Sequence, residues 1–219
     1  MKHLVLKDIR IIGFINIILA LVALVVGTVG VYYQDLFKSN AIYIIPILIG
    51  TYLIVMTLTN KDVLYNVQPL LISIPTKRFD IVKARYLTVF SYILFLVVTI
   101  SLSSNISKLV FRNINGSPFG LIPMIFTISL LLVFLSITIP IQYYDTKKAQ
   151  IINILLYMFI ILFPNVYNRL GLDFINSRLL ENIAQLNFKI ITPIVFIISL
   201  SMYIASLFIS KTLYSRKEF

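Results

Sequence analysis

Few side chains in this sequence are of the types that carry out chemistry. The 219 residues include eight acidic residues, one histidine (His3) and no cysteine. Thiolate metal sites, disulfides and cysteine nucleophiles are therefore excluded, and a single histidine cannot provide the pair that a zinc protease helix requires. The glycine pairs Gly27/Gly30 and Gly116/Gly120 are not followed by Lys-Ser or Lys-Thr, so no phosphate-binding loop is present. We expect no catalytic residue, no metal ligand and no cofactor site on this chain.

The composition indicates an integral membrane protein. Hydrophobic residues make up 59% of the chain, the mean hydropathy is +0.97, and only 12% of the residues are charged. Soluble domains average about 25% charged residues, and a water-soluble fold could not bury so much apolar surface. The net charge of +11 is spread over short loops and does not form one compact basic domain, which argues against a nucleic-acid partner.

Six apolar stretches are long enough to cross a bilayer core of about 30 Å. Unbroken apolar runs favour helices over barrel strands, so we predict an all-α bundle of six transmembrane helices in a single transmembrane domain, residues 1–219. None of the six contains Asp, Glu, Lys, Arg or His, which argues against an intramembrane enzyme and a proton-coupled transporter. The predicted spans are residues 11–31, 41–58, 86–103, 121–141, 151–166 and 190–209.

Lysine and arginine are distributed unevenly between the two sides of this predicted bundle. Thirteen of the 19 lie on the side that holds both termini and the hairpin of residues 60–85, and six lie on the other side. Because cytoplasmic loops carry the excess of basic residues, we predict that both termini and this hairpin are cytoplasmic. On this interpretation Lys77, Arg78, Lys83 and Arg85 do no more than determine which side the hairpin faces.

The predicted spans contain a few polar side chains. Asn and Thr inside a bilayer commonly form hydrogen bonds between helices, worth about 0.6 kcal/mol each, and we expect this role in preference to contact with cargo. The bundle is also rich in Phe and Tyr, and an uncharged aromatic interior suits amphipathic or hydrophobic cargo. The polar residues concerned are Asn16, Thr28, Thr51, Asn153 and Asn165.

The hairpin of residues 60–85 is punctuated by proline. Pro69 is suited to begin a short helical element, because its missing N–H costs nothing at the first helical position. Pro75 ends that element, and Thr76 is suited to cap a new helix that runs through Arg85 into the third span. The apolar element before Pro75 either lies on lipid headgroups or docks into the groove of a cytoplasmic partner.

Several segments resemble ABC-2 type exporter permeases. Residues 71–78, LISIPTKR, and residues 81–86, IVKARY, are similar to the signature that leads into the third helix of that family. Residues 7–8, Lys-Asp, resemble the family's N-terminal pattern. Pro140, followed by two lysines at residues 147–148, resembles its second cytoplasmic turn. Length, number of spans and topology also fit the family over the whole chain.

The resemblance implies a membrane subunit that another protein drives. A separate ABC ATPase subunit would bind ATP and Mg²⁺, and a coupling helix in the hairpin would sit in a cleft of that subunit. A second interface would involve Asp145, Lys147 and Lys148, although Asp145-Thr146 replace a stretch that usually contains Gly. The first interface would comprise Asn66, Val67, Gln68, Pro69, Leu70, Leu71, Ile72, Ser73, Pro75, Lys77 and Arg78.

Between the fifth and sixth predicted spans, residues 169–189 have apolar positions at helical spacing. This pattern predicts an amphipathic helix at the outer interface, which either packs passively or closes the outer end of the pathway. The resemblance favours the second interpretation, because ABC-2 permeases carry re-entrant helices there. The gate candidates are Leu172, Ile175, Leu179, Ile183 and Leu186.

Together these features predict a non-catalytic permease subunit in a bacterial plasma membrane. As the resemblance implies, it would pair with a second permease chain, identical or related, within the lipid bilayer and export amphipathic cargo, peptides foremost. The alternative is a scaffold that assembles a membrane complex without transporting anything. An intramembrane enzyme is a third class, and the absence of a base within the predicted spans argues against it.

Overall fold

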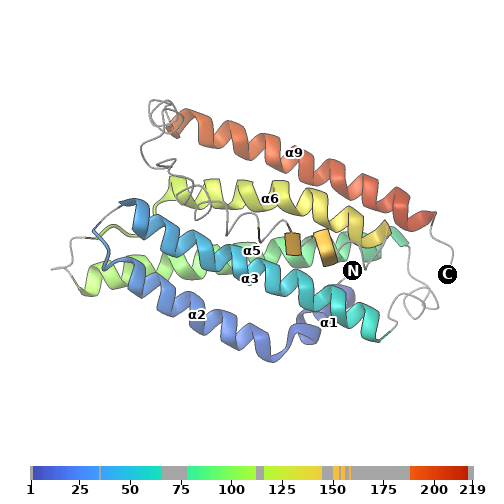
Figure 1. Cartoon of the computed structure of the whole chain (residues 1–219), viewed down its shortest axis with the longest axis horizontal. Helices are drawn as coiled ribbons and strands as arrows, with labels where there is room; N and C mark the ends of the chain where they lie inside the picture. The colour runs from blue at the N-terminus through green and yellow to red at the C-terminus, as the bar shows by residue number, and fades with distance from the viewer. Residues whose placement is uncertain are drawn as a thin grey trace.

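A computed structural model shows an all-helical protein over residues 2–34, 36–65, 78–111, 116–144, 150–152, 154–155, 158 and 188–216, the part of the chain that it describes. The long helices lie side by side along the longest axis, and both termini lie at the same end of the bundle (Figure 1). The helices are α1 (Lys2–Ile12), α2 (Phe14–Gly30), α3 (Leu36–Leu64), α5 (Arg78–Val110), α6 (Leu121–Tyr144) and α9 (Phe188–Ser215).

Four of these helices, α3, α5, α6 and α9, are each long and apolar enough to cross a membrane. A bent pair, α1 with α2, raises the number to five if it counts as one span. The fifth predicted span (151–166) falls mostly outside the described residues, and the predicted outer segment (169–189) falls almost entirely outside them. The number of six spans therefore stays a prediction.

The first predicted span, 11–31, is wrong at its beginning. The chain turns by 73° between α1 and α2, so Ile11 and Ile12 belong to α1 and the long helix begins at Phe14. The turn is at Gly13, whose φ of 49° lies in the left-handed region that glycine adopts without steric cost. The Asn16 side chain stabilises the turn by donating a hydrogen bond of 3.2 Å to the Ile9 carbonyl.

Two helices continue well beyond the predicted spans at the end where the termini lie. Helix α3 extends to Leu64, so residues 60–64 are helical, although we had assigned them to the hairpin. Helix α5 begins at Arg78 and continues without interruption to Val110. This confirms the prediction of one helix running through Arg85 into the apolar segment. Only residues 65–77 separate α3 from α5.

Helix α5 is central, because it contacts α1, α2, α3, α6 and α9. Its closest neighbour is α2, where the backbone of Gly27 approaches Ile100 and Ser103 of α5. A Cβ atom on Gly27 would overlap the Ser103 hydroxyl and lie 2.8 Å from the Ile100 carbonyl oxygen. The missing side chain therefore sets the spacing of α2 and α5, as small residues commonly do between membrane helices.

We predict that Gly27→Ala lowers the free energy of unfolding by about 1–3 kcal/mol, because the added methyl group overpacks this contact. Thermal unfolding of the purified protein, followed by circular dichroism, measures the change. Gly120→Ala is the matched control, since its Cβ would meet nothing closer than Pro123 Cδ at 3.7 Å. Equal stability of the two variants would show that α2 and α5 do not depend on Gly27.

Candidate functional site

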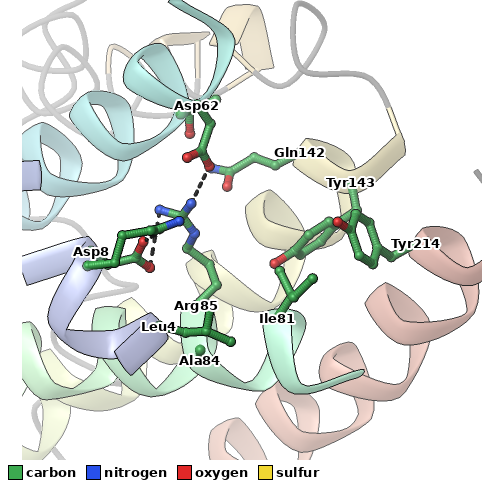
Figure 2. Close-up of a pocket in the computed structure, with 11 residues that line it drawn as sticks. Leu4, Asp8, Asp62, Ile81, Ala84, Arg85, Gln142, Tyr143 and Tyr214 are labelled. Atoms are coloured by element: carbon green, nitrogen blue, oxygen red, sulfur yellow. Dashed lines mark hydrogen bonds and ion pairs between the residues drawn. The ribbon is translucent and has the colours of Figure 1, made fainter. Parts of the chain in front are cut away.

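A buried arginine lies between two aspartates that come from different helices. Arg85 of α5 forms an ion pair and hydrogen bond through Nη2 with Oδ2 of Asp62 on α3. Its Nη1 lies 3.6 Å from Oδ2 of Asp8 on α1. Figure 2 shows the guanidinium group between the two carboxylates. We call these three residues the charged cluster.

Three local features of the structure bring the residues of the charged cluster together. Asp62 lies in the last turn of α3, and Arg85 lies two turns into α5, so the two residues flank the connection 65–77 on its bundle side. The turn at Gly13 folds α1 back against α3 and α5, which places Asp8 on the buried face of α1. Lys61 holds this arrangement by donating a hydrogen bond of 2.5 Å to the Ile11 carbonyl at the end of α1.

The charges balance within the site. The side chains of Asp8, Asp62 and Arg85 are only 4%, 17% and 11% exposed. Because little water reaches these charges, each must be stabilised by the opposite charge of its partners. Lys7, whose Nζ lies 3.2 Å from Asp8 Oδ1, adds a second positive charge. Two carboxylates thus face two cations. The planar guanidinium of Arg85 can contact both carboxylates at once, which a lysine ammonium could not do with the same geometry.

The cluster borders a cavity of about 40 Å³. Gln142 of α6 reaches toward Asp62 in Figure 2, and its Nε2 is buried without a hydrogen-bond partner among the described residues. The rings of Tyr143 (α6) and Tyr214 (α9) close another wall of the cavity and pack edge to face, with centroids 5.2 Å apart. The cavity therefore brings α1, α3, α5, α6 and α9 to one point.

Immediately after Arg85, hydroxyl groups join α5 to α9. The Tyr86 hydroxyl is 2.7 Å from both Ser206 Oγ and Ser210 Oγ. Tyr203 of α9 donates a hydrogen bond of 2.9 Å to the Tyr86 carbonyl, and Ser206 donates one of 2.7 Å to the Ser136 carbonyl of α6. The same segment of α5 is thus held on one side by charges and on the other by hydroxyl groups.

The contacts of the charged cluster join helices to one another. The described residues contain no group of three or more His, Cys, Asp or Glu that could hold a metal ion. The guanidinium is engaged by carboxylates, and no nucleophile with an adjacent base lies in the cavity lining. The chemistry that these contacts support is the rigid attachment of α1 and the end of α3 to α5.

Comparison of the sequence with known protein families identifies a family of transport proteins. Residues 3–215, nearly the whole chain, match the family described as ABC-2 family transporter protein. The chain belongs to the ABC-2 transporter family. No curated protein and no solved structure matched the chain. Family membership makes it a multi-pass membrane component of an ABC transporter, which works with an ABC ATPase.

Most predicted interface residues of this ABC-2 protein lie outside the described part of the structure. This applies to the hairpin residues 66–75 and Lys77, to Asp145, Lys147 and Lys148, and to the outer gate candidates within 169–189. Arg78 is described: it begins α5, and its Nη1 donates a hydrogen bond of 2.9 Å to the Ser215 carbonyl at the end of α9. The beginning of α5 is therefore joined to the end of α9.

The polar residues predicted to join helices have different partners. The Asn16 side chain joins α2 to α5, because its Oδ1 accepts a hydrogen bond of 2.7 Å from the Tyr92 hydroxyl of α5. Thr28 and Thr51 donate instead to carbonyls of their own helices, those of Val25 and Ile47, so the prediction was wrong for them. Asn153 and Asn165 lie outside the described residues.

The interpretation of Arg85 and Lys83 as markers of membrane side was incomplete. Arg85 is buried in the cluster, and Lys83 Nζ lies 4.1 Å from the centroid of the Phe79 ring. The sequence does contain a signal for the cluster. Asp62 and Arg85 carry opposite charges and each lies within two turns of a predicted span, at the same end of the bundle. Counting charges for orientation does not reveal such pairs.

We predict that Arg85→Met lowers the free energy of unfolding by about 3–5 kcal/mol, because it leaves two buried carboxylates without their shared cation. Unfolding of the purified ABC-2 protein in mild detergent measures this loss. The triple variant Arg85→Met, Asp8→Asn, Asp62→Asn should recover most of it, because all three buried charges are then removed together. If the triple variant is no more stable than Arg85→Met, charge pairing is not what holds the three helices.

Proposed function

We propose that this chain is the permease subunit of an ABC exporter, energised by a separate ATPase subunit that binds ATP and Mg²⁺. The observation that carries the proposal, beyond family membership, is the charged cluster at the base of the hairpin between α3 and α5. A hairpin can pass on a displacement from outside the membrane only if the helix ends on either side of it stay fixed relative to one another. Arg85 meets this requirement by tying together both helices that flank the hairpin.

Helix α5 is suited to carry the displacement onward. It is unbroken from Arg78 to Val110 and contacts the five other named helices of the described chain. A push on the hairpin would therefore reach the opposite end of the bundle through one continuous helix, without a flexible joint. In this proposal the hairpin residues Asn66–Ser73 form the coupling helix, and residues 145–148 form the second contact with the ATPase.

The membrane topology belongs to the same proposal. Both termini lie at one end of the bundle (Figure 1), and this is the end where the basic residues are concentrated. The distribution of basic residues supports a cytoplasmic position for this end. Six spans, with the outer gate at residues 172–186, complete the proposed arrangement in a bacterial plasma membrane.

The cargo pathway would require a second permease chain. The cavity at the charged cluster, about 40 Å³, is far too small for a peptide. Helices α2 and α9 expose large apolar side chains along their length, including Phe14, Leu21, Ile197 and Phe208, which suit contact with lipid or with a second permease chain. We propose amphipathic peptides as cargo, with peptides of the staphylococcal phenol-soluble modulin kind as the first to test.

We predict that the double substitution Leu71→Asp, Ile72→Asp abolishes co-purification of the ATPase subunit. Two charges on the apolar face of a docked helix would be buried without partners, which costs several kcal/mol. Affinity purification of the complex from membranes measures the binding. Leu109→Asp, a similar change at an exposed position (71%) at the other end of α5, should retain the ATPase. Retention by the double variant would exclude a coupling helix at this position.

We predict ATP-dependent accumulation of a labelled amphipathic peptide in inside-out vesicles that contain this chain and its ATPase. Replacing ATP by a non-hydrolysable analogue should reduce accumulation to background, because closure without hydrolysis cannot reset the cycle. A complex that binds the ATPase normally but accumulates no peptide under any condition would favour the non-transporting scaffold. Docking and transport are thus tested separately.

A further inference from the structure

The outward face of α1 is basic, and one of its residues, Lys7, is paired with Asp8 of the same helix at 3.2 Å. His3, Lys7 and Arg10 follow one another at helical spacing, so they lie on one face. Asp8 is the sole acidic residue of α1, and it is buried. No ion pair involves Arg10 within the described part of the chain, where its side chain is exposed.

Apolar side chains border this basic face. Leu6 is 49% exposed and lines, with His3, Lys7, Arg10 and Ile11, an open hollow of about 490 Å³. One turn further along α1, Ile9 borders a second hollow of about 260 Å³, whose wall is mostly apolar and includes Phe95 of α5. Positive charge therefore lies directly beside two open surfaces that suit apolar groups.

The orientation of α1 is held firmly. It lies at 73° to α2, so if α2 crosses the membrane, α1 runs nearly parallel to the membrane surface. The pairing of Asp8 with Arg85, together with the hydrogen bonds from Lys61 to Ile11 and from Asn16 to Ile9, attaches α1 at both its middle and its end. Its outward face is consequently presented in a fixed direction.

We propose that this face binds anionic phospholipid of the adjacent leaflet. The phosphate of the headgroup lies against Arg10, and the apolar part of the lipid covers Leu6 and the hollow beside Ile9. Basic amphipathic helices bind the membrane interface in this way, and each basic side chain near an anionic surface strengthens binding. The proposal does not depend on the exporter function.

A tryptophan reporter tests the proposal directly, because the chain contains no Trp. Leu6→Trp places a single fluorophore on the face, and the full chain is reconstituted with brominated phosphatidylglycerol or brominated phosphatidylcholine. We expect phosphatidylglycerol to quench preferentially. Adding Arg10→Gln should lower its binding preference over phosphatidylcholine about fivefold, the effect of removing one basic group near the membrane surface.

Arg216→Gln is the matched control, since it removes an exposed arginine at the end of α9 and should leave the preference unchanged. Equal quenching by the two lipids, or no effect of Arg10→Gln, would overturn the proposal. Absence of quenching by either lipid would show that the face points away from the bilayer. Loss of the preference on adding millimolar inorganic phosphate, or on adding the ATPase subunit, would assign the face to that occupant instead.

Discussion

The structure depends on one constraint: the charge of Arg85 is buried and must be neutralised by groups that come from elsewhere in the chain. No carboxylate on α5 itself is paired with it in the described structure; one partner comes from α3 and the other from α1. Asp8 and Asp62 can each reach Arg85 only if α1 and α3 are held in defined positions against α5. The turn at Gly13 is therefore as necessary to the site as the carboxylates, because it brings Asp8 back to the bundle.

The two kinds of contact on α5 differ in strength. Breaking a buried ion pair by removing one partner costs about 3–5 kcal/mol, whereas a hydrogen bond between membrane helices contributes about 0.6 kcal/mol on average. Arg85 joins α5 to α1 and α3 by the first kind, and Tyr86 joins it to α9 by the second. At this end α5 is thus joined to α1 and α3 by buried charges, and to α9 by hydroxyl groups and by the Arg78 hydrogen bond to Ser215.

Local patterns predicted the helices but not how they meet. Apolar run length and the absence of ionisable residues correctly indicated membrane helices, and the helix predicted to run through Arg85 into the bundle is present as α5. The bend at Gly13 was missed because α1 ends in Ile11 and Ile12, which extend the apolar run of α2. The contact of Tyr86 with Ser206 joins residues 120 positions apart, and nothing in either local sequence indicates the other.

These contacts have a mechanical consequence for an ABC-2 protein. The charged cluster joins three segments: α1, the end of α3 and the beginning of α5. Moving one of them away from the others would leave a buried charge without its partner, so we expect the three segments to move as one body. The hydroxyl contacts with α9 involve both Ser206 and Ser210, which lie one turn apart and are each 2.7 Å from the Tyr86 hydroxyl. Gln142 of α6, whose amide nitrogen has no hydrogen-bond partner among the described residues, does not hold α6 to the cluster through that atom. The charged cluster therefore joins α1, the end of α3 and the beginning of α5, and the Arg78 hydrogen bond to the Ser215 carbonyl attaches the end of α9 to the same segment.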